Sequence, residues 1–333
     1  SEQKSGFFTD FYVEAGRLNE SSARYHYGNS TSYFDLASLT KPLVTGALVH
    51  SYMRKIGLSR SDALASWPDQ QWQKNFSSDL MKLSVESLLS HRSGLPAWRN
   101  FWMNHLNEGP LPIAQQMNKL ISDTFARIKP LLPAEDIYSD VGYLLLGYAL
   151  EAASGQRLDD LWADYLQSLG LSALDLGYGP QLHQPLNAFI PSAHCAVRAR
   201  LLQGEVHDEN CAALGGIAGH AGLFGSGKST GDYLRKLYQS NEGMLFLQAN
   251  ESLLKTHGFE GLSGLRRGAG TSAALFANGK GMGHLGFTGT AFWLDLPSKR
   301  YALFLTNRVI SGRLNPHMTA VRRQVFGHLN ELA

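Results

Sequence analysis

Apolar and polar residues alternate near both ends of this chain, which is the pattern of half-buried β-strands. At the N-terminal end the alternation covers residues 11–15 and 25–27, and at the C-terminal end it covers 291–296 and 301–306. The middle of the chain, from about residue 60 to 200, shows helical spacing and loops instead. Strands at both termini with helices between them predict one antiparallel sheet built from both ends of the chain, with a helical lobe inserted into it.

The length of the chain suggests how this architecture is divided. At 333 residues it exceeds the size at which a single hydrophobic core stops growing. We therefore expect an α/β (α+β) protein with a sheet subdomain from residues 1–60 and 200–333, a helical subdomain from residues 61–199, and an active-site cleft between them. Helical spacing also predicts a helix at 113–128 and a closing amphipathic helix at about 316–332. The segment 141–153 is apolar almost all round and is closed by Ser154-Gly155, which predicts an interior helix. The turn at 297–300 between the two last alternating segments predicts a hairpin.

Composition excludes several kinds of partner. The chain is 44% hydrophobic and 17% charged, with a net charge of +2 and no long run of one sign, which argues against nucleic acid or an anionic membrane. No segment has the roughly 18–20 continuous apolar residues of a membrane span. Cys195 and Cys211 could form one disulfide or stay reduced, and their spacing matches no zinc site. We expect no metal, no organic cofactor, a monomer, and a small-molecule or peptide substrate.

Ser38 and Lys41 place a hydroxyl and an amine three positions apart. Pro42 indicates that the helix running on to Tyr52 begins close to Ser38 or Leu39, because proline is tolerated only in the first turn of a helix. Residues three apart share a helix face, with Cβ atoms about 5–6 Å apart. A serine beside a lysine of lowered pKa, in an electropositive and partly dry site, can lose its proton and attack a carbonyl carbon. Alone, the spacing also fits an N-capping serine and a solvated lysine.

Further motifs follow this one in order along the chain. Together they resemble the motifs of class C β-lactamase-type serine hydrolases, the superfamily of penicillin-binding proteins and related esterases. The resemblance covers about residues 7–330 and implies a β-lactamase/transpeptidase-like fold, with an antiparallel sheet flanked by terminal helices and a mostly helical lobe. The matching blocks are Phe34-Asp-Leu-Ala-Ser38-Leu-Thr-Lys41, Leu88-Leu-Ser-His91-Arg-Ser-Gly94-Leu-Pro96, Ile137-Tyr138-Ser-Asp140, Gly283-His284-Leu-Gly286-Phe287 and, for a subgroup of the family, residues 204–224.

The resemblance implies a role for each matching residue. Ser38 would be the acyl-enzyme nucleophile and Lys41 its base partner. Tyr138 matches the tyrosine of the family's Y-x-N motif, which passes a proton to the leaving group. A phenol titrates near 10, so it would need a neighbouring cation such as Lys41 to act near neutrality. Gly286 would let the substrate backbone approach, and the Phe287 N–H would join the Ser38 N–H in an oxyanion hole.

Two residues depart from the family pattern. Asp140 replaces the asparagine of Y-x-N, so that an acceptor stands where an amide donor would bind a substrate carbonyl. His284 replaces the lysine that many members use to hold a substrate carboxylate. This H-x-G variant resembles the D-aminopeptidase, esterase and penicillin-binding-protein-like branches more than efficient β-lactamases.

Several histidines lie near these motifs. By resemblance, His207, Asp208 and His220 are candidates to line the cleft. Together with His194 they also invite interpretation as a metal site, but their spacing puts no two ligands on one helix face, and no cysteine pair assists. His91 lies in a His-Arg-Ser-Gly turn and is expected to be a structural hydrogen-bonding residue, since the lysine and the tyrosine already fill the base role.

Residues 222–229 fit the phosphate-binding pattern G-x-x-x-x-G-K-[ST], with Lys228 as the phosphate ligand. Such a loop follows a hydrophobic strand, whereas residues 214–221 are mostly glycine and alanine. No alternating βαβ pattern follows in the rest of the chain. A P-loop NTPase is therefore only a remote alternative.

The sequence predicts a serine hydrolase that forms an acyl-enzyme on Ser38 and acts on D-Ala-D-Ala-type peptides or β-lactams. A carboxylesterase or D-aminopeptidase-type hydrolase of the same family is the close alternative. A binding module that keeps the fold and only acylates slowly is a third. Because the resembling proteins mostly act on cell walls, we expect a periplasmic or extracytoplasmic location, with the cytoplasm as the alternative.

Overall fold

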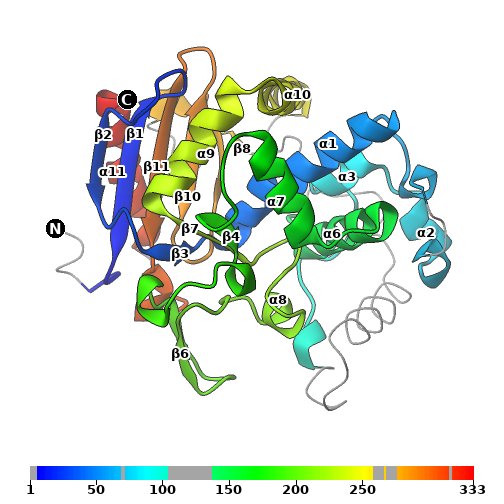
Figure 1. Cartoon of the computed structure of the whole chain (residues 1–333), viewed down its shortest axis with the longest axis horizontal. Coiled ribbons are helices and arrows are strands. Elements are labelled where there is room, and N and C mark those ends of the chain that lie inside the picture. The colour runs from blue at the N-terminus through cyan, green and yellow to red at the C-terminus, as the bar shows by residue number, and fades with distance from the viewer. Residues whose placement is uncertain (1–5, 69–71, 104–136, 258–265, 268–275, 315–316) are drawn as a thin grey trace.

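The computed structural model describes residues 6–68, 72–103, 137–257, 266–267, 276–314 and 317–333. Its main layer is a six-stranded sheet with helices on both faces (Figure 1). Every neighbouring pair of strands is antiparallel, which confirms the predicted α/β architecture. In spatial order the strands are β2 (Tyr25–Gly28), β1 (Phe11–Arg17), β11 (Arg300–Thr306), β10 (Ala291–Asp295), β9 (Met282–Leu285) and β8 (Arg266–Arg267).

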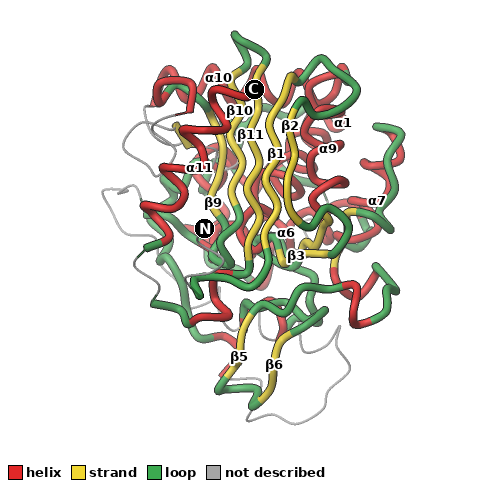
Figure 2. The backbone as a smooth tube through the Cα atoms, turned by 90° about the vertical axis from the view of Figure 1, so that its left-hand side faces the viewer, coloured by secondary structure: helices red, strands yellow, loops and turns green. Residues whose placement is uncertain are grey.

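The two ends of the chain meet inside this sheet. β1 pairs with β11 along its whole length, from Phe11 opposite Thr306 to Arg17 opposite Arg300, and Figure 2 shows the two strands side by side. β10 and β11 form the predicted hairpin. The sheet is therefore built from both termini, as the alternating segments predict.

Helices from the C-terminal part of the chain cover the two faces of the sheet. α11 (Met318–Leu332) buries Val321 and Phe326 in the same apolar cluster as Val13 of β1. Burying an apolar side chain of this size stabilises the fold by about 1.5–3 kcal/mol. Glu14 points to the opposite face, because successive residues of a strand alternate, and there it pairs with Arg235 of α9 (Gly227–Gln239).

The other described helices lie to the right of the sheet and α9 in Figure 1. The predicted helix at 113–128 lies outside the described residues. No helix in the described part of the chain is long and apolar enough to cross a membrane. The helices to the right of the sheet and α9 are α1 (Ala47–Ile56), α2 (Ser78–Met81), α3 (Val85–Leu89), α6 (Asp140–Ser154), α7 (Leu158–Ser168), α8 (Glu209–Ala213) and α10 (Asn241–His257).

Two small sheets were not predicted. One has the strand order β3 (Tyr33–Asp35), β7 (Leu223–Ser226) and β4 (Leu176–Tyr178), and the other pairs β5 (Ala193–Cys195) with β6 (Arg200–Leu202). The first is buried throughout, so its short strands show no alternation. Because β4 and β5 lie within residues 61–199, that part of the chain is not purely helical. The division into two subdomains with a cleft between them stays a prediction.

The ends of α6 explain its position. The Ser139 hydroxyl caps the helix by accepting the Gly142 N–H at 3.1 Å, and Gly155 ends it with φ = 71°, a conformation that favours glycine. The helix is buried on nearly every side, as its apolar sequence predicts. Its cap places Asp140 in the first turn, where the helix dipole favours a negative charge.

Candidate active site

Ser38 lies in a helix whose pitch changes along its length. Residues Ala37–Leu39 form a 3₁₀ turn, residues Lys41–Gly46 form a π-helix, and α1 continues from there. The helix begins where Pro42 predicts, but its first turns are not α-helical. Ala37 has φ = 49°, in the left-handed region, which costs a non-glycine residue about 1–2 kcal/mol. Backbone strain of this kind clusters at functional sites.

Asp35, at the end of β3, holds this strained turn. One carboxylate oxygen accepts the Ala37 N–H at 2.8 Å, and the other accepts the His207 N–H at 2.7 Å. The residue is 3% exposed, and burial raises the pKa of its carboxyl to about 6, although the two N–H donors act against this rise. The amino-acid sequence suggested no role for Asp35. The available signal was an acidic residue in an apolar strand directly before a turn, which is typical of an Asx turn.

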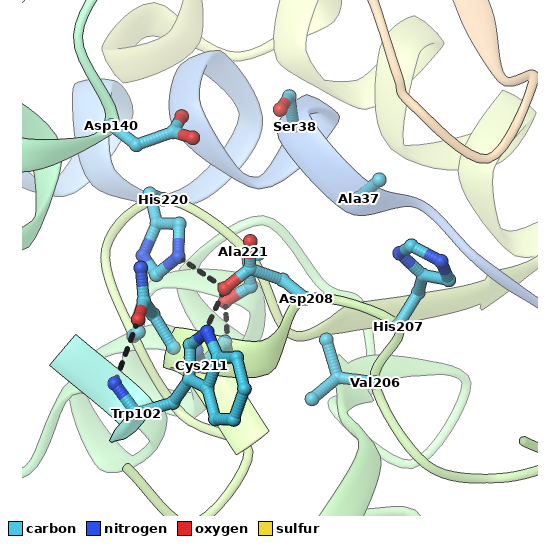
Figure 3. A network of polar contacts seen from close by, with 12 residues as sticks. Ala37, Ser38, Trp102, Asp140, Val206, His207, Asp208, Cys211, His220 and Ala221 are labelled. Carbon is cyan, nitrogen blue, oxygen red and sulfur yellow. Dashed lines mark hydrogen bonds and ion pairs between the residues drawn. The ribbon is translucent and has the colours of Figure 1, made fainter. Parts of the chain in front are cut away.

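Lys41 connects three parts of the chain. Its Nζ atom donates to Ser38 Oγ at 2.9 Å and to the His220 carbonyl oxygen at 3.0 Å, and it lies 2.6 Å from Asp140 Oδ1. The side chain is fully buried. In Figure 3, Asp140 from α6 and Ser38 both lie above His220 and Asp208. The spacing of Ser38 and Lys41 therefore predicted their contact correctly.

The charge state of Lys41 differs from the expectation. Burial alone would lower the pKa of Lys41, but the nearby Asp140 carboxylate and the Tyr138 phenol outweigh burial and raise this pKa above its ordinary value. The pKa of Tyr138 is also raised, because burial and Asp140 together outweigh the lowering effect of Lys41. The expectation that Lys41 and Tyr138 would have lowered pKa values is therefore wrong. In the free site Lys41 is an ammonium group and Tyr138 a neutral phenol.

Tyr138 joins Ser38 and Lys41, as the motif order predicts. Its phenol hydrogen-bonds with both side chains, and Lys41 Nζ lies 5.1 Å from the centre of its ring. The tyrosine directly precedes the Ser139 cap of α6. Its ring centre also lies 5.9 Å from that of His284 at the end of β9.

His91 supports the loop that carries Tyr138, which agrees with the structural role expected for it. Its ring Nδ1 accepts the Ser139 N–H at 2.9 Å, and its carbonyl oxygen accepts the Ile137 N–H at 3.1 Å. The His91 and Tyr138 ring centres lie 4.4 Å apart. His91 therefore contacts the residues on both sides of Tyr138 and the tyrosine ring itself.

Gly286 and Phe287 follow β9 in a loop beside Ser38. A Cβ atom on Gly286 would collide with the Thr290 hydroxyl and lie 2.8 Å from the Leu36 carbonyl oxygen, so the loop itself requires glycine here. This packing requirement is additional to the approach of the substrate backbone, which the family resemblance implies for this glycine. Phe287 is 43% exposed, and its carbonyl oxygen accepts Arg308 Nε at 2.7 Å.

His207, Asp208 and His220 lie beneath Ser38 and Asp140 in Figure 3. Asp208 Oδ1 contacts His220 Nε2 at 2.8 Å and caps α8. Burial would raise the pKa of Asp208, but His220 outweighs it and holds this pKa below its usual range. Burial and Arg313 lower the pKa of His207 to about 4, so this ring is neutral at neutral pH. No group of three metal-ligating side chains occurs in the part of the chain that the structure describes.

Lys228 and the two cysteines answer questions left by the sequence. Lys228 is 75% exposed at its side chain and pairs with Asp232 at 2.6 Å on the same helix. The residues before it form strand β7, whose backbone pairs with β3 and β4, so they make no phosphate-binding loop. Cys195 and Cys211 are both buried free thiols.

The family of the chain follows from comparison with known proteins. The family model described as Beta-lactamase matches residues 23–325. A protein of Escherichia coli K12, provisionally named D-alanyl-D-alanine carboxypeptidase, is 29% identical over 325 residues, covering 86% of this chain and 72% of its own. N-acetylmuramyl-L-alanine amidase of Bacillus subtilis 168 is 28% identical over 324 residues, covering 86% of this chain and 71% of its own.

Solved structures share the fold at lower identity. D-amino acid amidase from Ochrobactrum anthropi SV3, complexed with L-phenylalanine, has a TM-score of 0.70 and 15% identity, covering 100% of this chain and 95% of that one. The class C β-lactamase from Rhodobacter sphaeroides has a TM-score of 0.67 and 14% identity, covering 100% and 97%. Both confirm the β-lactamase/transpeptidase-like fold. Because the family model spans nearly the whole chain, the protein belongs to the beta-lactamase family and is a serine hydrolase.

Proposed function

We propose that Ser38 is the nucleophile of an acyl-enzyme hydrolase that cleaves D-Ala-D-Ala-type peptides or their β-lactam mimics. The observation that carries the proposal is the position of the Lys41 ammonium group, which contacts the Ser38 hydroxyl on one side and the Asp140 carboxylate on the other. The names of the relatives, a D-alanyl-D-alanine carboxypeptidase and an N-acetylmuramyl-L-alanine amidase, support cell-wall peptides as the substrate class.

The charges of the site suggest a proton relay. The reactive form of the site is the one in which Lys41 has released its proton to solvent, which leaves an amine facing Ser38 Oγ. This amine removes the hydroxyl proton while Oγ bonds to the substrate carbonyl carbon, whose oxygen becomes an oxyanion. When the carbonyl reforms, the bond to the leaving nitrogen breaks and that nitrogen takes the Tyr138 phenol proton. Lys41 then reprotonates Tyr138 and returns to the amine form. Water cleaves the acyl-enzyme by the same steps in reverse.

The Ser38 and Phe287 N–H groups are the proposed oxyanion donors. The loop that carries Phe287 is tied to the residues before Ser38, because the Thr288 hydroxyl donates to the Asp35 carbonyl oxygen at 2.7 Å. The Thr290 hydroxyl likewise donates to the Leu36 carbonyl oxygen at 3.1 Å. Preorganised donors of this kind are valuable, since losing one costs about 100–1000-fold in turnover.

A carboxylesterase or a D-aminopeptidase-type hydrolase is the second candidate, and His284 favours it. The His284 ring Nδ1 contacts the Leu285 carbonyl oxygen at 2.8 Å, and the side chain is buried. It therefore cannot offer the long, mobile cation with which a lysine would hold a substrate carboxylate. Asp140 also presents an acceptor to the substrate. Both residues suit a substrate whose group at this position is neutral or cationic.

We also propose where the protein acts. Cell-wall peptides lie outside the cytoplasm, which supports a periplasmic or extracytoplasmic location. We also propose a monomer, since Ser38, Lys41, Tyr138 and Asp140 contact one another within one chain.

A probe experiment tests the nucleophile. A fluorescent penicillin and a fluorophosphonate should label the wild-type protein and leave Ser38→Ala unlabelled, and equal labelling of both would remove Ser38 from the mechanism. Turnover of nitrocefin, a p-nitrophenyl ester and a D-amino-acid amide, measured side by side, then separates β-lactamase, esterase and amidase activity. Release of the bound penicillin over time distinguishes an enzyme from a module that only acylates.

A further inference from the structure

Arg322, on α11, lies behind the loop that carries Phe287. It is 8% exposed, and its Nη2 atom donates to the Gly286 carbonyl oxygen at 3.0 Å and to the Thr290 carbonyl oxygen at 3.2 Å. These two residues are the first and last of the 286–290 loop, and the Gly286 N–H also donates to the Thr290 carbonyl oxygen at 2.7 Å. One guanidinium group therefore joins both ends of the loop.

In the described part of the chain, no acidic side chain balances this buried cation. Among the described residues Arg322 pairs with no carboxylate, and its Nε has no hydrogen-bond partner. Burial and the neighbouring Arg308 lower the pKa of Arg322 to about 9, so it still carries its charge at neutral pH. Burying a charge without an opposite partner is costly, and an apolar side chain would fill the same space at lower cost. The position therefore points to an electrostatic role.

The peptide group that Arg322 contacts is the one that contributes the Phe287 N–H. In a trans peptide the C=O and N–H groups point in opposite directions. Because the guanidinium group binds the Gly286 oxygen, the Phe287 N–H points away from α11. A hydrogen bond to the oxygen polarises the whole peptide group and strengthens its N–H as a donor. The positive charge behind the peptide also favours a negative charge in front of it.

We propose that Arg322 is a positioning residue that strengthens the Phe287 N–H as an oxyanion donor. This inference rests on the proposed role of Ser38. Arg322 acts on the transition state through the Gly286–Phe287 peptide group and through the closed shape of the loop. It does not touch the substrate, so its effect falls on the rate of acylation and not on binding.

The test compares Arg322→Met and Arg322→Lys with a control, Arg323→Met. Arg323 is the exposed neighbour on the same helix. The Met variant should fold, because the Gly286 carbonyl oxygen keeps the Gly289 N–H and the Thr290 carbonyl oxygen keeps the Gly286 N–H. Reaction with a fluorophosphonate, followed at several probe concentrations, gives the limiting rate constant and the apparent dissociation constant separately.

We expect Arg322→Met to lower the limiting rate constant by about 10-fold or more, a smaller loss than removal of the donor itself, with the apparent dissociation constant unchanged. Arg322→Lys should recover part of the rate because it keeps a charge, and Arg323→Met should match the wild type. A wild-type rate in Arg322→Met overturns the inference, as does an equal loss in the Met and Lys variants accompanied by weaker binding. Failure of the proposed function is a separate result, equal labelling of the wild type and Ser38→Ala.

Discussion

The Nζ atom of Lys41 lies 2.6 Å from Oδ1 of Asp140, closer than the 2.9 Å that separates it from the Ser38 hydroxyl. Asp140 stands where the family's motif carries an asparagine. Breaking a buried ion pair by removing one partner costs about 3–5 kcal/mol, so the carboxylate both anchors the lysine and keeps it charged. The base partner of Ser38 therefore depends on a residue from another helix.

Asp140→Asn should move the acidic limb of the acylation pH profile to lower pH. Asp140 raises the pKa of Lys41, whereas burial of Lys41 lowers it and persists in the variant. The amine form of Lys41 should therefore appear at lower pH, and acylation should begin at lower pH with it. Fluorophosphonate labelling rates across the pH range measure this. Asp160→Asn, at an exposed position of α7, is the control, and an unmoved limb in Asp140→Asn would contradict the relay.

Asp35→Asn should change how stability depends on pH. The pKa of Asp35 is raised from its ordinary 3.8 to about 6 in the folded protein. Between these values the folded protein holds a proton that the unfolded chain has lost, so this group's contribution to stability is present below pH 4 and lost as pH rises through 6. The loss is about 2–3 kcal/mol. Thermal unfolding at pH 4 and pH 7 should show a smaller difference in the variant, and identical differences would refute the assignment.

His91→Leu should slow acylation and destabilise the protein, because it leaves the buried Ser139 N–H without its acceptor. An unpaired buried donor costs about 1–3 kcal/mol. His91→Asn is the matched control, since its amide oxygen can accept the same N–H and asparagine tolerates the positive φ of 60° found here. Melting temperatures and labelling rates of the two variants check this. If the Leu variant behaves as the wild type, the Tyr138 loop does not depend on His91.

Gly147→Ala should destabilise the protein and slow acylation. A Cβ atom on Gly147 would lie 2.9 Å from the Gly219 backbone nitrogen, beside the carbonyl groups that hold Thr45 and Lys41. Overpacking of this kind costs about 1–3 kcal/mol. Gly142→Ala, on the same helix, is the control: its nearest contact would be an ordinary 3.6 Å, and better helix propensity should stabilise it by up to about 1 kcal/mol. Equal melting temperatures for the two variants would contradict this account.

Local sequence signals were enough for the main elements of the fold. Alternating residues predicted β1, β10 and β11, and an apolar segment closed by Gly155 predicted α6. These signals work because an alternating strand, or a long apolar segment closed by a glycine cap, can be identified without knowing its partner. The sheet of β3, β7 and β4 was missed because strands of three or four buried residues have no periodicity.

The order of the motifs also predicted that Ser38, Lys41 and Tyr138 lie together. The amino-acid sequence determined which chemical groups meet, because spacing within a helix and motif order are properties of the chain itself. Only the tertiary structure decided their charges. The pKa of Lys41 rises because burial brings Asp140 against it, and the His220 carbonyl and the Arg322 guanidinium group reach their targets across the fold. Contacts made through the backbone or between distant elements leave no pattern in the sequence, because they exist only after the chain has folded.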